Sequence, residues 1–414
     1  MQGLRNIPRI TPSARSRMEA WIDRQITDRN LADFIREYWQ RPVVLYTGAG
    51  VSAGPWRRTG GKQLGLPPWR DLLGQVAGLP SGDDLPDDLW RAAEKAEEAC
   101  NGRDGLQSKL RSFIADLDHY REKGQLNGRL LANAPTLKAV AAFCGQPTGR
   151  VESKAKGKSP TTYFRVAANP RVHAILTSNY DCFLEAAGSN LYRTSPMKPV
   201  TALGSKAASA SRVPVFHIHG YVPHPLHQDP EVEGQTDRLV LTRKEYMKQW
   251  GESAEFGYTM GPQVHLLRYY TALFVGFSFN DTYVCNLLRT LRGSYKKHGS
   301  SSHYALLRAG SVAKKPRGFF EELGVNPIDY QTHADIPSLL GQIYMAGLTG
   351  DRIMARERPV DKTCLPELRA RTHEQLRHEV QYDTDQIWRI MLMLRNGGIR
   401  TSAIRDCERR VRRS

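Results

Sequence analysis

Four short motifs of polar and glycine residues each follow an apolar run that is typical of a buried strand. They are Gly48-Ala49-Gly50-Val51-Ser52, Thr177-Ser178-Asn179-Tyr180-Asp181, His217-Ile218-His219-Gly220 and Gly276-Phe277-Ser278-Phe279-Asn280-Asp281. Because ligands of open α/β sheets bind outside the carboxyl ends of the strands, these motifs are the first candidates for chemistry.

The glycine motif at residues 48–52 suits the approach of a phosphate. Small residues let backbone N–H groups come close to the anion, and the start of a following helix favours its negative charge. The motif is not a complete GxGxxG fingerprint, and it lacks the Lys-Ser/Thr pair of ATP-hydrolysing phosphate loops. A phosphate cradle and a purely structural turn therefore both remain open. In the last motif, Gly276 and Ser278 suit the backbone of a dinucleotide, and Asp281 suits the cap of the next helix.

The two middle motifs carry the candidate reacting groups. Asn179 and Asp181 can hydrogen-bond the hydroxyl groups of a sugar, although both residue types also cap helices. His217 and His219 are two positions apart, so they are expected to share one side of a strand. His219 is expected at the mouth of that strand, where it is a candidate general base near neutral pH, with a structural histidine as the alternative.

Short apolar strands alternate along the chain with helical or loop segments. The strands are predicted at Val43–Thr47, Val172–Thr177, Val213–His219, Leu239–Thr242, Leu273–Gly276 and His303–Leu307, and the pattern closes near Gly324–Tyr330. Apolar residues recur at the spacing of a helix over residues 18–40 and 86–145, near 336–345 and in the tail from 350. Residues 146–170 are predicted to form a basic loop. This alternation predicts an α/β fold with a mostly parallel sheet covered on both faces.

The composition is that of a globular protein and excludes a disordered or fibrous chain. The chain has 414 residues, with 59 Lys and Arg against 42 Asp and Glu, and a net charge of +17. The excess is spread out, and much of it lies in residues 1–16, 146–171 and 399–414. These are either solvated basic segments or contacts for DNA or another acidic partner.

The sequence also bears on the compartment. No apolar run approaches the roughly 18 residues of a membrane span, and the N-terminus has no apolar signal region. The six cysteines form no CxxC pair, so neither a zinc ribbon nor a disulfide framework is expected. We predict a cytoplasmic protein with reduced thiols and no membrane contact.

Taken in order, the motifs GAGVSAG, TSNYD, HG and GFS at strand ends resemble those of the sirtuin family. The segment Gly65-Leu66-Pro67-Pro68-Trp69-Arg70 resembles the Gly-Ile-Pro-Asp-Phe-Arg loop that covers the nicotinamide in that family, with Pro68 in place of the Asp. The zinc module of sirtuin deacetylases, which has two CxxC pairs, is missing, and their acyl-lysine clamp is not recognisable in residues 221–245.

A subgroup of the family fits these departures. The segment Val240–Tyr246 and the GFSFND form of the last motif resemble the bacterial sirtuin-like NADases of antiphage defence. The size, the helical insertion and the helical tail are similar to those of the sirtuin-like subunit that pairs with a HerA-type ATPase. The resemblance implies a Rossmann-like α/β fold with a helical insertion and a helical C-terminal extension.

The resemblance covers about residues 21–345, and it suggests three parts. Residues 1–20 would be a basic N-terminal arm. Residues 21–345 would be the catalytic domain, with the insertion at about 81–165. Residues 346–414 would be a helical extension for an oligomer or a partner. In it, Ile387, Ile390, Met391 and Leu394 form an apolar stripe, which either packs on the protein's own core or forms an oligomer or partner surface.

The resemblance also implies NAD as substrate and cleavage of its nicotinamide–ribose bond. By motif position, Asn179 would hold the ribose hydroxyls or the attacking water, His219 would be the base, and Asp181 would orient the sugar or cap a helix. The pyrophosphate of the dinucleotide would be bound by Gly48, Ala49, Gly50 and Ser52, and its adenosine side by Gly276 and Ser278. Arg70 would contact a phosphate, and the alternative for Arg70 is a surface salt bridge. No metal is needed.

Partners and competing functions follow from the same comparison. A free NADase would deplete the NAD of its own cell, so we expect a homo-oligomer or a HerA-type ATPase partner to control it. The alternatives are an NAD-dependent protein deacylase or ADP-ribosyltransferase, and a non-catalytic sensor that binds ADP-ribose and nucleic acid.

Overall fold

The chain forms two compact units in a computed structural model. The structure describes residues 10–52, 57–59, 62–64, 69–79, 89–116, 134–153, 161–191, 195–200, 212–222, 239–242, 244–245, 257–295 and 303–357. Among these, residues 41–331 form the first unit, and residues 10–40 with 332–357 form the second.

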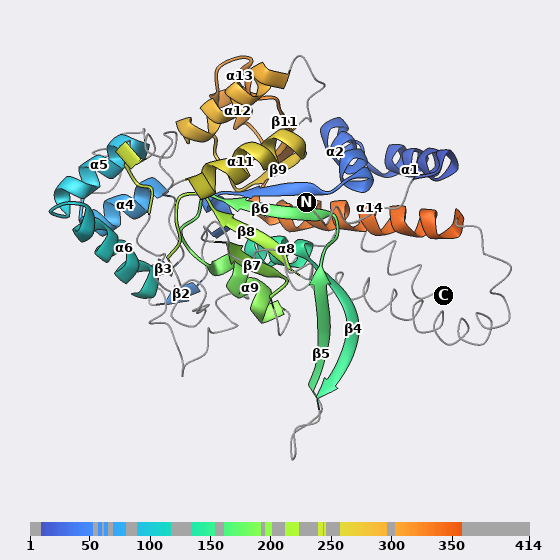
Figure 1. Cartoon of the computed structure of the whole chain (residues 1–414), viewed down its shortest axis with the longest axis horizontal. Helices are drawn as coiled ribbons and strands as arrows, with labels where there is room; N and C mark the ends of the chain where they lie inside the picture. Colours follow the sequence, from blue (N-terminus) through green and yellow to red (C-terminus); the bar gives the residue numbers. More distant parts are fainter. Residues whose placement is uncertain are drawn as a thin grey trace. The chain divides into compact units, whose positions relative to one another are not determined.

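The first unit is built on a seven-stranded sheet in which every strand pair is parallel (Figure 1). Its strands are β1 (Val43–Thr47), β6 (Val172–Thr177), β7 (Met197–Val200), β8 (Val213–His217), β9 (Ala272–Val275), β10 (His303–Arg308) and β11 (Val325–Tyr330). Their spatial order is β11-β10-β9-β1-β6-β8-β7. The predicted Rossmann-like α/β fold is confirmed. Within this sheet, β6, β7 and β8 lie on one side of β1, and β9, β10 and β11 lie on the other, so the strand order reverses at β1.

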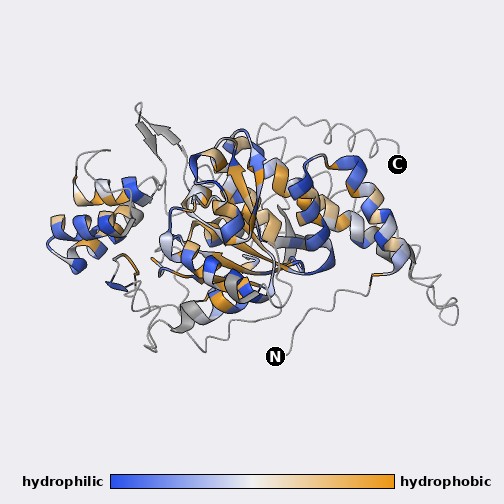
Figure 2. Ribbon diagram, turned by 90° about the horizontal axis from the view of Figure 1, so that it is seen from above, coloured by the Kyte–Doolittle hydropathy of each residue, from blue (hydrophilic) through white to orange (hydrophobic). Residues whose placement is uncertain are grey.

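Helices cover both faces of this sheet, which explains the nearly continuous apolar strands. Figure 1 shows α11 (Gly257–Tyr269), α12 (Thr282–Tyr295) and α13 (Phe319–Leu323) on one face, with α8 (Pro135–Cys144) and α9 (Phe183–Leu191) on the other. Every residue of β1 and β9 is buried. Figure 2 shows the apolar residues concentrated on the strands, as expected for a parallel sheet that is shielded from water on both sides.

The long connection from β1 to β6 is helical in part, as predicted, but it also contains two hairpins. The helices are α3 (Ala49–Ser52), α4 (Trp69–Ala77), α5 (Leu89–Ala99), α6 (Arg103–Asp116) and α8, and α4, α5 and α6 pack on one another. The hairpins pair β2 (Arg57–Thr59) with β3 (Lys62–Leu64), and β4 (Gly145–Ser153) with β5 (Thr161–Ala168).

The second hairpin corrects the prediction of a loop at residues 146–170. The Gly, Ser and Pro residues of this stretch are typical of a loop. The run Thr161-Thr162-Tyr163-Phe164 consists of β-branched and aromatic residues, which favour a strand. Two further strand predictions need correction: β8 ends at His217 rather than at His219, and residues 239–242 are not a strand.

The second unit consists of α1 (Pro12–Gln25), α2 (Arg29–Gln40) and α14 (Ile336–Glu357), which pack together. One continuous helix over residues 18–40 was predicted, and the structure has two. Thr11 and Pro12 begin the first, and Asp28 begins the second by accepting the N–H of Leu31 at 2.7 Å. Helix α1 continues across the domain boundary expected at residue 20, and α14 continues across the one expected at residue 345.

Several predictions lie outside the described residues. They concern the nicotinamide-loop residues Gly65–Pro68, residues 1–9, and the tail from residue 358 with its stripe at 387–394. Among the helices that the structure describes, none is long and apolar enough to cross a membrane.

Candidate active site

The four motifs lie at one edge of the sheet because their strands end in register. Thr47 of β1 is paired with Val275 of β9 on one side and with Thr177 of β6 on the other, and Thr177 is paired with His217 of β8. The residues that follow these four positions therefore leave the sheet side by side. The reversal of strand order at β1 makes the edge between β1 and β9 the place where open α/β folds bind ligands.

Backbone contact between the first and last motifs explains their glycines. A Cβ on Gly50 would lie 2.8 Å from the carbonyl oxygen of Gly276, and a Cβ on Gly276 would lie 2.5 Å from the nitrogen of Val51. Gly276 also has φ +65°, in the left-handed region that favours glycine. The N–H groups of Gly48 and Gly50 donate to the carbonyls of Val275 and Gly276. These glycines therefore join two strand ends, which supports the structural-turn reading of the motif, while Ala49 and Gly50 remain partly exposed.

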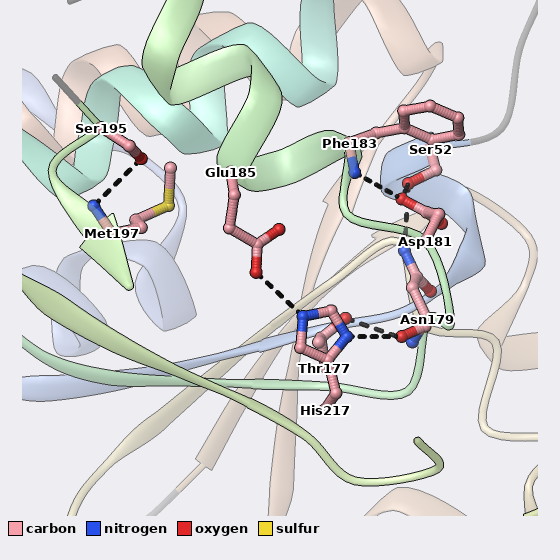
Figure 3. Close-up of polar contacts among 9 residues, drawn as sticks. All are labelled: Ser52, Thr177, Asn179, Asp181, Phe183, Glu185, Ser195, Met197 and His217. Atoms are coloured by element: carbon pink, nitrogen blue, oxygen red, sulfur yellow. Dashed lines mark hydrogen bonds and ion pairs between the residues drawn. The ribbon is translucent and has the colours of Figure 1, made fainter. Parts of the chain in front are cut away.

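A buried hydrogen-bonded cluster joins the first two motifs (Figure 3). The amide Nδ2 of Asn179 donates to Oγ of Ser52 at 3.1 Å, and that hydroxyl donates to Oδ1 of Asp181 at 3.1 Å. Asp181 Oδ1 also accepts the N–H of Phe183 at 3.0 Å, so the predicted helix-capping role at the start of α9 is present. The structure brings Ser52 next to Asn179 and Asp181, which lie 127 and 129 positions further along the chain.

Burial makes Asp181 an unusual carboxylate. It is almost inaccessible to solvent, and this desolvation raises its pKa to about 6, against the lowering effect of the hydrogen bonds from Phe183 and Ser52. The group therefore changes charge close to neutral pH. Perturbed titration of this kind is typical of functional sites, although structural networks also produce it.

His217 lies between the backbone of Asn179 and the side chain of Glu185. Its Nδ1 lies 3.0 Å from the carbonyl oxygen of Asn179, and its Nε2 lies 2.8 Å from Oε1 of Glu185 on α9 (Figure 3). Burial alone lowers the pKa of His217, but the Glu185 carboxylate and the two hydrogen bonds outweigh this, so the pKa is raised. The sequence analysis did not pair these residues. The available signal was a Glu in the first turn of α9 and a His at the end of a neighbouring strand.

His219 lies in the turn after β8, and its partner comes from the last motif. Its Nε2 is 3.0 Å from Oδ2 of Asp281, and both residues are buried. The expectation that His217 and His219 share a side of a strand is wrong, because the strand ends between them and they contact different carboxylates. The predicted cap is confirmed: Asp281 Oδ1 accepts the N–H of Val284 at the start of α12, at 3.2 Å.

Aromatic residues and a loop surround this pair. The ring of Tyr180 stacks on Trp69 with centroids 4.5 Å apart and lies 6.3 Å from the ring of His219. The hydroxyl of Tyr180 donates to the carbonyl of Val240, whose N–H in turn donates to the carbonyl of His219 at 2.8 Å. The segment 239–242 thus holds both motifs in place.

The same loop is anchored to the helical insertion. Oε2 of Glu245 accepts the N–H groups of Leu241 and Thr242 at 2.6 and 2.9 Å, and Glu245 forms an ion pair with Arg103 of α6. Arg103 also donates to the carbonyl of Leu239 at 3.2 Å. The insertion therefore contacts the loop that contacts His219.

The remaining predicted binding residues lie around this edge. Ser278 is exposed between the buried rings of Phe277 and Phe279, and Phe279 has φ +56°. Arg70 is half-buried at the start of α4, next to the Trp69 that stacks on Tyr180. Within the described part of the chain, no cluster of His, Cys, Asp and Glu has the arrangement of a metal site.

Comparison with known families points to one class of protein. A model of the SIR2-like domain matches residues 173–328, which include the second, third and fourth motifs. The match supports a sirtuin-like family, and it is consistent with an enzyme that uses NAD. No curated protein matches the chain.

Proposed function

We propose that the protein is an NAD+ glycohydrolase, which splits NAD into nicotinamide and ADP-ribose. The observation that carries the proposal is the meeting of Asn179, His219 and the glycine turn at neighbouring strand ends in a sirtuin-like domain. The buried polar network around them supports a site that orients a sugar, because a buried network of this kind fixes the positions of its members.

The reaction breaks the C–N bond between the ribose and the nicotinamide. The bonding electrons leave with the nicotinamide, which becomes neutral, and the sugar carbon gains oxocarbenium character, as in other glycosidic cleavages. A water molecule then bonds to that carbon and gives its proton to a base. In the proposed site, Asn179 holds the ribose hydroxyls or the water, and His219 takes the proton. Activation of a ribose hydroxyl instead of water would give a cyclic product.

The binding residues are proposed from their place at the β1 and β9 ends. Ala49 and Gly50 are partly exposed and would lie beside the pyrophosphate. Gly48 and the buried Ser52 would support this turn from within. Gly276 and the exposed Ser278 would lie on the adenosine side, and Arg70 would meet a phosphate. Gly50 and Gly276 bring the ends of β1 and β9 into backbone contact, because a Cβ on either would collide with the other motif, and the dinucleotide is proposed to lie beside this junction.

One experiment separates this proposal from its two rivals. Purified protein is incubated with NAD, with and without an acetyl-lysine peptide, and the products are separated by chromatography. A glycohydrolase releases nicotinamide without any acceptor. Release that requires the peptide would favour a deacylase or ADP-ribosyltransferase, and intact NAD under every condition, with linear DNA included, would favour a sensor. The lack of CxxC pairs already disfavours a deacylase with the usual zinc module.

We further propose that the activity serves antiphage defence and is controlled by assembly. An unregulated NADase would consume the NAD of its own cell, so homo-oligomerisation or a HerA-type ATPase partner is the proposed control. The insertion helices offer a physical route for that control, since Arg103 of α6 holds the loop that contacts His219. Repeating the NAD incubation with the candidate ATPase tests the partner.

A further inference from the structure

The geometry points to Asp281 as the residue that positions His219 for catalysis, a role that rests on the proposed function. Asp281 was expected only to cap a helix. It does cap α12, through Oδ1, but its second oxygen faces Nε2 of His219 at 3.0 Å. One carboxylate therefore joins the start of a helix to the candidate base.

The surroundings restrict the imidazole to one orientation. Both residues are buried, with 3% of His219 and 6% of Asp281 exposed. The rings of Tyr180 and Tyr283 each have their centroid 6.3 Å from that of His219, and the carbonyl of His219 accepts the N–H of Val240. Asp281 cannot easily turn away, because its other oxygen holds the backbone of Val284.

A carboxylate opposite Nε2 determines where the imidazole carries its proton. A carboxylate oxygen only accepts hydrogen bonds, so it requires a proton on Nε2. In the neutral ring the basic nitrogen is then Nδ1. After His219 takes a proton from the attacking water, the same carboxylate stabilises the imidazolium. Asp281 does not touch the reacting atoms and acts through His219.

The substitution Asp281→Asn tests this role, because it separates the cap from the charge. Asn is as good an N-cap as Asp, so its single oxygen is expected to keep the bond to Val284. Its NH2 group then faces Nε2 of His219 and forces the proton onto Nδ1, the wrong tautomer for the base. We expect kcat for nicotinamide release to fall by at least about 10²-fold while KM for NAD stays unchanged, the pattern of an interaction made only in the transition state.

Two further variants control for structure. Asp281→Ser also retains a capping oxygen but removes the carboxylate, and it should lose kcat in the same way. Asp28→Asn makes the same chemical change at the cap of α2, and it should retain wild-type kcat. Thermal unfolding of all variants shows which are folded. Wild-type kcat in a folded Asp281→Asn or Asp281→Ser protein would overturn the proposal, since a cap alone predicts that result.

A second readout does not depend on activity. Protein with ¹⁵N-labelled histidine gives imidazole nitrogen resonances that distinguish the tautomers, and the His219→Gln variant identifies the signals of His219. We expect a protonated Nε2 in the wild type and a changed pattern in Asp281→Asn. A proton on Nδ1 alone, or a pattern unaffected by Asp281→Asn, would overturn the inference. If the NMR result holds but wild-type protein releases no nicotinamide under any condition, the proposed function fails and the pairing stands.

Discussion

At the scale of single residues, the candidate site buries the carboxylate of Asp181, although desolvation disfavours its charged form. Asp181 is buried, and its Oδ1 accepts hydrogen bonds from Ser52 and Phe183. Desolvation raises its pKa from 3.8 to about 6. A raised carboxyl pKa means that the folded protein binds a proton more tightly than the unfolded chain. The stability that this tighter proton binding by Asp181 contributes is therefore fully present below pH 4 and is lost as the pH rises through 6.

We accordingly expect Asp181→Asn to stabilise the protein at neutral pH. The amide retains an oxygen for the N–H of Phe183 and has no charge to desolvate. The gain is on the order of 2–3 kcal/mol at pH 7.5, from a pKa shift between 3.8 and about 6, and it is smaller at pH 5. Urea unfolding at the two pH values measures it. An equal gain at both values, or a loss that grows with pH, would contradict the assigned titration.

The candidate reacting residues were predictable from the sequence, and most of their partners were not. Asn179, Asp181 and His219 stand out because each polar group follows an apolar strand. Glu185, His217 and Asp281 act through contacts 32, 38 and 62 positions away along the chain. Spacing alone does not reveal such pairs, since they depend on which strands become neighbours and where each strand ends.

At the scale of elements, the junction of β1 and β9 depends on glycine for two separate reasons. Gly276 has a left-handed backbone, and a Cβ there would also collide with the nitrogen of Val51 and the carbonyl carbon of Gly50. Gly310 has a left-handed backbone as well, with φ +81°, but a Cβ there would meet nothing within 4 Å. The two positions therefore separate backbone strain from steric contact.

We expect Gly310→Ala to cost about 1 kcal/mol of stability, the strain of a left-handed alanine. Gly276→Ala should cost about 3 kcal/mol or more, because it must also separate two strand ends in backbone contact. Chemical denaturation of both variants provides the comparison. Equal costs would show that the β1–β9 contact is less tight than the structure has it.

The predictions of helices and strands succeeded where the residues of a segment all favour one structure, and they failed where residues typical of different structures are mixed. Buried strands such as β1 and β6 are mostly apolar, so their positions were predicted correctly. The hairpin of β4 and β5 was missed because turn-forming residues and basic charge obscured the aromatic and β-branched run that starts at Thr161. The break between α1 and α2 was missed because Asp28 was not recognised as a cap.

At the scale of the whole molecule, the features that bear on the proposed assembly are the two units, the tail and the basic charge. The tail has an apolar stripe at helical spacing, and the net charge is +17. Helix α14 belongs to the second unit and ends at Glu357. Its Gly350 packs closely against Trp39 of α2, since a Cβ on Gly350 would lie 2.0 Å from Nε1 of Trp39. A useful truncation must therefore leave this helix intact.

We expect a chain that ends after Glu357 to retain its fold but lose its oligomeric state. The stripe of Ile387, Ile390, Met391 and Leu394 is the proposed contact between copies, and burial of such a face is what stabilises an oligomer. Light scattering on the full chain and the truncated chain compares the two masses. A full chain that is monomeric, or a truncated chain with unchanged mass, would remove the tail from that role.

The most direct test of the central claim is the release of nicotinamide from NAD by the purified protein, with no acceptor and with the candidate ATPase present or absent. Wild-type protein should release nicotinamide in at least one of these conditions. Asn179→Ala and His219→Ala, both folded, should each lose roughly 10²–10⁴-fold of that rate. Wild-type turnover in either variant would show that these motifs do not form the catalytic site.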